Sequence, residues 1–317
     1  MKRALAALGL VWTLAACDPF GLPSTRALEA GAAETLAARS FEVKGEYSAA
    51  GSHWTIDLKL SRPDTEHVVA GNGVDSVEAV LIGDAAYFRG RQFLVSHLTD
   101  PRSRSLVAAA GDSWWKGLSV RLPTLPDLTD ATAFRSTFLG QAVSTRNDHR
   151  IVSGVDAVEL SGPRADVYVG SAPPYPLLRV VIRGGVKIDG ISDADLLYSG
   201  AGSDFGIAAP SGVLDFSNAS TLPPIYTVES VDTSRCSSPC TVSAGVRNLG
   251  GLGAAQAPST VTFTMTDPVS KRILGTCAAT VQPDVGYNST TAVSCSISAQ
   301  LVNGAVVTAV AANPGRA

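Results

Sequence analysis

Apolar and polar side chains alternate in two neighbouring stretches of this 317-residue chain, and this alternation limits the fold more than any other feature. Residues 41–47 alternate in this way, and residues 54–60 do so again after the small-residue segment 49–52. A two-residue period is typical of a β-strand with one buried and one solvated face. The sequence therefore predicts an antiparallel hairpin with one apolar face and one charged face.

Similar patterns predict more strands on both sides of a helical middle segment. Strands are expected at 65–70, 75–82, 85–89, 141–146, 150–152, 155–161, 164–169, 177–183, 185–189 and 192–198, with a short one at Trp114-Trp115. Helices are expected at 27–39, 92–99, 102–110 and 130–139, the last capped by Asp130, and the proline-containing segment 123–128 is expected to be loop. Because neighbouring strands twist by about 20–25°, such a sheet must curl. We therefore expect a mainly β, α+β fold: a curved antiparallel half-barrel sheet with helices in its concave face.

The N-terminal residues predict export and a lipid anchor. Lys2 and Arg3 precede an apolar run, 4–14, that is too short to span a bilayer about 30 Å thick, so residues 1–16 are interpreted as a signal peptide. The segment Leu14-Ala15-Ala16-Cys17 resembles the bacterial lipobox, in which the cysteine is acylated and becomes the new N-terminus. The alternative is an ordinary secretory signal that happens to contain a cysteine. We expect an extracytoplasmic protein held at the cell membrane through acylated, palmitate-bearing Cys17, with residues 17–25 as a tether.

A polar, proline-ended linker, 218–224, separates a first unit, 26–217, from a second unit, 225–317. Beyond the linker the composition shifts to Thr, Val, Ser and Gly. Strands are expected at 225–232, 240–247, 259–266, 272–281, 290–299 and 304–312. Short strands at regular spacing predict a β-sandwich.

The four remaining cysteines lie in the second unit, and an even number in an exported domain favours disulfides. Three pairings are possible, of which we favour Cys236–Cys240 and Cys277–Cys295. A zinc site is the alternative, but the sequence has no second closely spaced cysteine pair and no nearby histidine.

Composition and motifs argue against several functions. The net charge of −3 offers no basic excess for nucleic acid. Phosphate-loop, metalloprotease and nucleophile-elbow motifs are absent from the sequence, and His53, His67, His97 and His149 lie on separate segments. Asp189, Asp193 and Asp195 suggest a cation site, although solvated charges explain them better. We expect no enzyme activity, no cofactor and no metal.

The first unit resembles the LolA/LolB-like lipoprotein-carrier superfamily, nearest to the LppX/LprG type of actinobacterial lipoprotein. The similarity lies in the hairpin 41–60, in 80–90, in Trp114-Trp115, in 155–160 and in 193–198, together with the lipobox. The resemblance implies an open half-barrel that holds acyl chains of lipids or lipoproteins in an apolar cavity. The candidate lipid-binding residues are Phe41, Val43, Trp54, Ile56, Leu58, Phe88, Leu178, Val180 and Ile182.

The same apolar face would also serve a core filled by helices, because both arrangements need the same period. In that alternative the chain is an envelope scaffold or interaction lipoprotein. The segment 242–250 resembles adhesion-type bacterial Ig-like domains, and such a scaffold would contact another envelope protein through its Ig-like unit.

Overall fold

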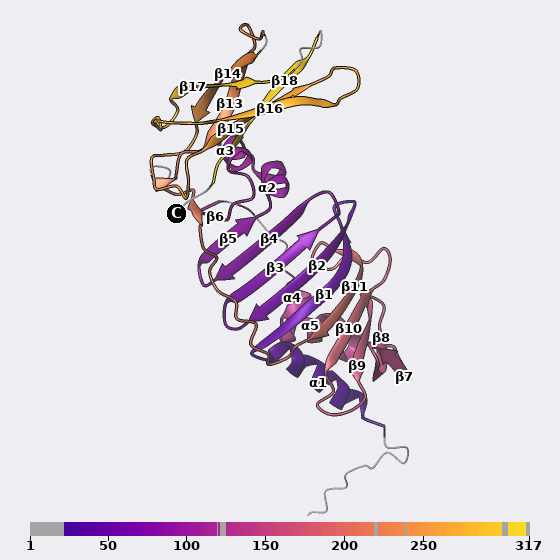
Figure 1. Ribbon diagram of the computed structural model, residues 1–317. Helices are drawn as coiled ribbons and strands as arrows, with labels where there is room; N and C mark the ends of the chain where they lie inside the picture. Colours follow the sequence, from indigo (N-terminus) through magenta and orange to yellow (C-terminus); the bar gives the residue numbers. More distant parts are fainter. Residues whose placement is uncertain are drawn as a thin grey trace, which may run out of the picture.

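A large curved sheet and a smaller sandwich make up the chain (Figure 1). The structure, a computed structural model, describes residues 22–118, 120, 125–218, 221–237, 239–299 and 304–314. Within these residues, twelve strands form the large sheet in the order β12-β6-β5-β4-β3-β2-β1-β11-β10-β9-β8-β7. Neighbouring strands are antiparallel except β12 and β6, which are parallel. The described residues form open sheets with a few helices, and this content confirms the expected mainly β, α+β fold.

The strands of the large sheet follow the alternation in the sequence closely. They are β1 (Ser40–Ala49), β2 (Ser52–Ser61), β3 (Thr65–Gly71), β4 (Ser76–Ile82), β5 (Ala85–Arg89), β6 (Trp115–Lys116), β7 (Thr145–Val152), β8 (Val155–Ser161), β9 (Ala165–Gly170), β10 (Leu177–Ile182), β11 (Ser192–Ser199) and β12 (Leu214–Asp215). The predicted hairpin pairs Val43 with Leu58 and Gly45 with Ile56. Its register places the apolar residues of both strands on one face, as a two-residue period requires.

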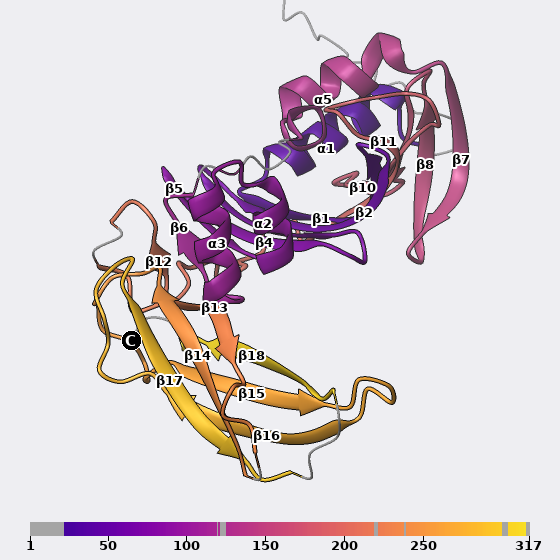
Figure 2. The same cartoon turned by 90° about the horizontal axis from the view of Figure 1, so that it is seen from above.

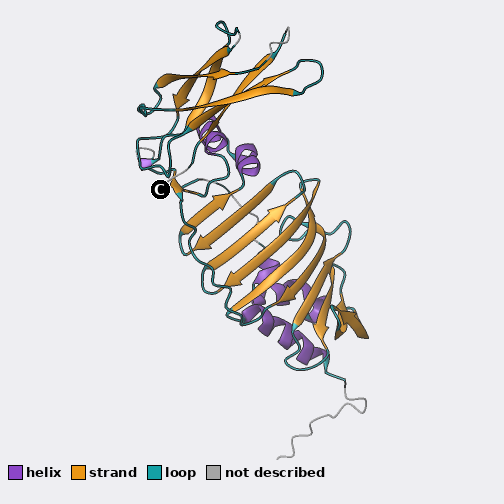
Figure 3. Cartoon of the chain, in the orientation of Figure 1, coloured by secondary structure: helices purple, strands orange, loops and turns teal. Residues whose placement is uncertain are grey.

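Helices cover that apolar face in two groups (Figures 2 and 3). They are α1 (Thr25–Ala37), α2 (Arg91–His97), α3 (Pro101–Ala110), α4 (Pro126–Thr129) and α5 (Ala131–Phe138), followed by the 3-10 turn η1 (Gly140–Ala142). Ser24 and Asp130 cap α1 and α5 by accepting backbone N–H bonds, and Asp100 does the same for α3. The helices α1, α4 and α5 lie at one end of the sheet, and α2 and α3 lie at the end nearer the second unit (Figure 1).

Four predicted elements were wrong. The segment expected as loop at 123–128 contains α4, which Pro126 begins at its first position. In place of the strands expected at 141–146 and 150–152 there is one strand, β7, which begins at Thr145 after η1 and bulges between Asn147 and Arg150. Residues 185–189 form no strand, because the left-handed residues Gly185 and Asp189 turn the chain there.

Two separate cores lie under the helices. The first core joins β1, β2 and β8–β11 to α1, α4 and α5, and its largest fully buried side chains include Phe41 and Phe134. The second core joins β3–β6 to α2 and α3 around the fully buried Trp115. Trp54 and Val68 are partly buried and contact both cores. The apolar face is therefore continuous, but helices cover it in two places.

The second unit is a sandwich of two sheets, each three-stranded within the described residues. One sheet is β13-β14-β17 and the other is β16-β15-β18. The strands are β13 (Tyr226–Asp232), β14 (Cys240–Asn248), β15 (Thr260–Thr266), β16 (Ile273–Thr280), β17 (Thr290–Ile297) and β18 (Val306–Ala312). The structure contains the disulfides Cys236–Cys240 and Cys277–Cys295. The second disulfide joins β16 of one sheet to β17 of the other.

The two units are in direct contact. Leu222 and Ile225, at the junction between them, are buried in the second core. Asn313 Nδ2 donates to the carbonyl of Ala109 in α3 and to that of Tyr226 in β13, at 2.8 and 3.0 Å. The Arg102 guanidinium also lies 4.6 Å from the centre of the Tyr287 ring. Apolar, hydrogen-bond and cation–π contacts therefore join the units.

Candidate functional site

The nine residues predicted to contact lipid do not lie together. Six of them are buried in the first core: Phe41, Val43, Ile56, Leu58, Val180 and Ile182. Phe88 is buried in the second core, and the partly buried Trp54 lies between the two. The apolar face was therefore predicted largely correctly, but the sheet divides it between two sets of helices.

Leu178 does not belong to this face. A register shift between Leu177 and Arg179 in the pairing of β10 with β9 interrupts the alternation. Leu177 therefore points into the first core, where it is fully buried, and Leu178 stays half-buried. A strict two-residue period cannot anticipate such a bulge.

Helices fill most of the concave face. Leu28 and Leu36 of α1, Leu128 of α4 and Phe134 of α5 are all fully buried against the strands. Because these side chains occupy the space over β1, β10 and β11, this part of the half-barrel is a packed core.

A pocket lies on the concave face, and we call it the concave pocket. Its volume is about 220 Å³, and it lies between β2, β3 and the segment leading into α4. Its apolar lining includes Ile56, Leu58, Leu60, Val68, Leu125 and Pro126. Arg62, Asp64, Glu66 and Asp130 are among its polar lining residues. Ligand pockets typically measure about 300–1,000 Å³, so this one has room for a small apolar group or one end of a chain.

Helix α4, which borders the concave pocket, is held by polar contacts as well as by the buried Leu128. Arg62 Nη2 donates to the Thr129 carbonyl at 3.0 Å and to the Leu36 carbonyl at 2.6 Å, so it joins α4 to α1. The Asp127 N–H donates to Asp189 Oδ2 at 2.9 Å. The Tyr198 hydroxyl donates to the Leu128 carbonyl at 3.0 Å. Burial raises the pKa of Tyr198, which keeps the hydroxyl protonated and able to donate.

Sequence reasoning missed these polar residues. Arg62 and Asp189 lie in turns, where charged residues are usually solvated. Burial raises the pKa of Asp189 despite the hydrogen bond from the Asp127 N–H. The one available signal for α4 was Pro126 followed by Asp127, because proline and an acidic residue are both favoured in the first turn of a helix.

The opposite, convex face of the large sheet carries paired charges. Lys44 Nζ lies 2.8 Å from Glu42 Oε1 and 3.4 Å from Asp57 Oδ2. Arg179 pairs with Asp195 across β10 and β11. These contacts agree with the charged hairpin face expected from the sequence.

Glu78 should make the stability of the protein fall on acidification. Burial by itself would raise its pKa, but hydrogen bonds with His67 and Arg89 lower it below the ordinary value. A carboxylate whose folded-state pKa is lowered stabilises the fold above its unfolded pKa of about 4.3. That contribution is lost as the pH falls through the folded-state pKa.

We therefore expect Glu78→Gln to lower the free energy of unfolding by about 1 kcal/mol near neutral pH. The difference from the native protein should disappear in strong acid. Urea titrations of both proteins across this pH range measure it. A difference that stays constant down to about pH 3 would show that the charge of Glu78 is not the cause.

The four histidines have separate partners. His53 lies 3.1 Å from Glu46, His67 lies 2.8 Å from Glu78, and His149 lies 3.9 Å from Asp156. His97 stacks on Phe93. Within the described part of the chain, no group of three or more His, Cys, Asp or Glu residues is placed to hold a metal ion. Asp189 and Asp195, two of the three aspartates considered for a cation, contact Asp127 and Arg179 respectively.

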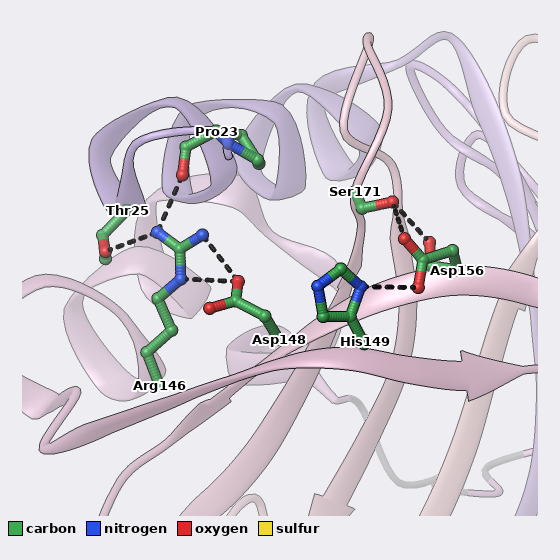
Figure 4. A network of polar contacts seen from close by, with 7 residues as sticks. All are labelled: Pro23, Thr25, Arg146, Asp148, His149, Asp156 and Ser171. Atoms are coloured by element: carbon green, nitrogen blue, oxygen red, sulfur yellow. Dashed lines mark hydrogen bonds and ion pairs between the residues drawn. The ribbon is translucent and has the colours of Figure 1, made fainter. Parts of the chain in front are cut away.

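The predicted lipidation site, Cys17, lies outside the described residues, as does most of the predicted tether. The chain enters the fold next to β7, where Arg146 Nη1 donates to the Pro23 carbonyl at 2.7 Å (Figure 4). Asp148 holds the same guanidinium through Nε at 2.9 Å and Nη2 at 2.6 Å. None of the helices in the described residues is both long and apolar enough to cross a membrane.

A larger, more open cleft of about 710 Å³ lies between α3 and the strands β13 and β18. Its lining is mostly small side chains, with Arg91, Asp112 and Asn313 among the polar residues. It offers less apolar shelter than the concave pocket, which makes it a poorer site for a lipid chain.

Comparison with known proteins gives little further information. No protein-family model and no curated protein matches the chain. It is similar to the crystal structure of MucB in complex with MucA(peri), with 15% sequence identity, a TM-score of 0.27, and coverage of 88% of this chain and 94% of the other. It is also similar to the MucA/MucB complex of Pseudomonas aeruginosa, with 15% identity, a TM-score of 0.30, and coverage of 86% and 94%. A likeness of this size leaves the family expected from the sequence a prediction.

Proposed function

We propose that this protein is a membrane-anchored, extracytoplasmic bacterial lipoprotein that binds part of a lipid acyl chain in the concave pocket. The observation that carries the proposal is the apolar wall of this pocket, which Ile56, Leu58 and Leu60 form. Helices fill most of the rest of the concave face. An acyl chain gains about 0.8 kcal/mol for each methylene removed from water, and binding of this kind needs no catalytic group. The role we propose is therefore binding or carrying without catalysis.

Of the charged residues around the pocket, Arg62 suits the polar head of an amphipathic ligand, whereas Asp64, Glu66 and Asp130 are acidic. Arg62 lines the pocket, and its Nε is buried without a hydrogen-bond partner among the described residues. A guanidinium binds carboxylates and phosphates strongly, so it suits the head of a fatty acid or phospholipid. The apolar end of the chain would then lie against Leu58 and Val68.

Lipid extraction tests this function directly. Protein purified from a membrane-bearing host should carry lipid that mass spectrometry detects in an organic extract, and the delipidated protein should take up a fluorescent fatty acid. Absence of both extractable lipid and uptake would reject the proposal.

Leu58→Trp should block the concave pocket. Leu58 is 6% exposed and points into the pocket, where an indole would occupy the space of the ligand. We expect fatty-acid uptake to fall about tenfold or more. The matched control is Val69→Trp, because Val69 is 40% exposed, lies on the other face of the sheet and does not line the pocket. Equal uptake by both variants would place the ligand elsewhere.

The second candidate function is an envelope scaffold whose second unit contacts another protein. The observation that favours it is the packing of α1 and α5, which leaves the concave pocket smaller than most ligand sites. A protein free of lipid, with no fatty-acid uptake, would support this function over the first.

A further inference from the structure

The turn between β7 and β8 exposes large apolar side chains at an edge of the large sheet. Ile151 is 69% exposed and Val155 is 45% exposed. Between them, Ser153 and Gly154 form a small, uncharged apex in left-handed conformations. We call residues 151–155 the hairpin tip. Figure 2 shows the β7–β8 hairpin extending along the side of the sheet.

Apolar surface continues from the hairpin tip onto the convex face. A groove of about 420 Å³ lies beside the tip, lined by Val152, Val155, Pro176, Leu178 and Leu197 among other residues. Leu197 is 39% exposed in a region where the neighbouring convex positions are charged. A contiguous exposed apolar surface of this kind marks an interaction site.

Each side of the hairpin tip carries one exposed apolar side chain, and Asp156 lies beside Ile151 on its side. Ile151 pairs with Asp156, and Val152 pairs with Val155, so Ile151 and Val155 lie on opposite sides of the two-stranded ribbon. A protein partner that docks on one side would leave the other side in water. A fluid lipid layer that receives the tip end-on covers both sides.

The last part of the predicted tether contacts the same strand. Arg146, near the start of β7, donates to the Pro23 carbonyl (Figure 4). The hairpin tip lies at the other end of this strand. Six residue steps separate Cys17 from Pro23, an extended reach of about 20 Å. Six steps along β7 from Arg146 to Val152 also span about 20 Å. A bilayer that holds Cys17 is therefore within reach of the hairpin tip.

We propose that the hairpin tip and the groove beside it dock into the surface of the lipid bilayer to which the protein is anchored. This inference rests on the proposed anchor at Cys17 but not on lipid binding in the concave pocket. Docking would fix the orientation of the large sheet above the membrane. The second unit, at the far end of the molecule in Figure 1, would be held away from the lipid.

The charges behind the tip are paired. Arg150 Nε donates to Glu159 Oε2 at 2.7 Å. His149 lies 3.9 Å from Asp156, and Ser171 donates to Asp156 Oδ2 at 2.6 Å (Figure 4). Because these charged side chains already have partners, docking depends on apolar contact and should not require anionic lipid.

Depth-sensitive quenching tests the docking. The full-length lipidated protein is reconstituted in phosphatidylcholine vesicles with or without brominated acyl chains, which quench tryptophan by contact. Ile151→Trp should lose about half of its added emission in brominated vesicles, because apolar side chains of docked segments enter the lipid by about 5–10 Å. The control is Ile273→Trp, since Ile273 is 61% exposed but lies in the second unit. Its added emission should not change.

If Ile151→Trp folds poorly, Val155→Trp serves as a second probe. Its added emission should fall in brominated vesicles by the same share. Unchanged emission at position 151 or 155 in anchored protein would overturn the proposal, as would equal quenching at position 273. If the protein does not float with vesicles, the anchor proposal fails separately. An N-terminal histidine tag on nickel-chelating lipid then tests the hairpin tip by itself.

Discussion

Export of residues 18–317 behind a cleavable leader that lacks a lipobox should move the protein from the membrane fraction to the soluble fraction. Acylation of Cys17 would add two hydrocarbon chains, and each buried methylene contributes about 0.8 kcal/mol to membrane binding. Two chains hold a protein stably where one chain gives only marginal binding. Removal of the anchor should therefore change the membrane-bound share from nearly all to nearly none.

Cell fractionation and incorporation of labelled palmitate measure this change. The native chain should carry the label and sediment with membranes, and the chain without Cys17 should do neither. A native chain that lacks the label would favour the alternative of an ordinary secretory signal. The hairpin tip alone should retain only a small share of the unanchored chain, because it exposes few apolar side chains.

Asn248→Ala should destabilise the second unit more than other polar substitutions. The Asn248 side chain is fully buried at the end of β14. Its Oδ1 accepts from the N–H groups of Ile225 and Gly250, each at 2.9 Å. Its Nδ2 donates to the carbonyls of Gly251 and Val285, at 3.0 and 2.6 Å. One side chain thus joins the start of the unit to two of its loops.

Alanine at this position would leave three buried backbone groups and one partly buried group, the Val285 carbonyl, without these partners. Each unsatisfied group costs about 1–3 kcal/mol, and partial relaxation makes a total loss of about 3–5 kcal/mol the expected result. Urea unfolding of the native and variant proteins measures the loss. The matched control is Asn147→Ala, because Asn147 is exposed on β7 and its replacement should cost less than about 0.5 kcal/mol. Equal losses for both variants would contradict this role of Asn248.

The elements that repeat a simple pattern were predictable. The hairpin β1–β2 and the strands β3, β4 and β5 lie close to their expected ranges, since each alternates over several residues between clear turns. Helices α1, α3 and α5 were also predictable, because each combines apolar spacing with a start signal such as Asp130. The cysteine pairs were predictable because two lie close together in the sequence and two lie in strands that follow one another along the chain.

The errors occur where a backbone irregularity breaks the period. The bulge before Arg179 moves Leu178 off the apolar face. Two strands were expected where the structure has the single strand β7, which continues through a bulge. Helix α4 depends on Arg62 and Asp189, which come from distant parts of the chain and carry no local signal for it. Local patterns cannot reveal such contacts, because they arise only when separate segments meet.

The sequence by itself determined that one face of a long, curved β-sheet is apolar, that helices accompany it, and that a disulfide-linked sandwich follows. Periodicity carries this information, because burial of one face is required whatever covers it. Only the tertiary structure decided what covers that face: α1 and α5 fill the first core, α2 and α3 form a second core, and a pocket of about 220 Å³ remains beside α4. A filled core and an open cavity need the same alternation of side chains, so the volume between sheet and helices depends on how distant segments pack.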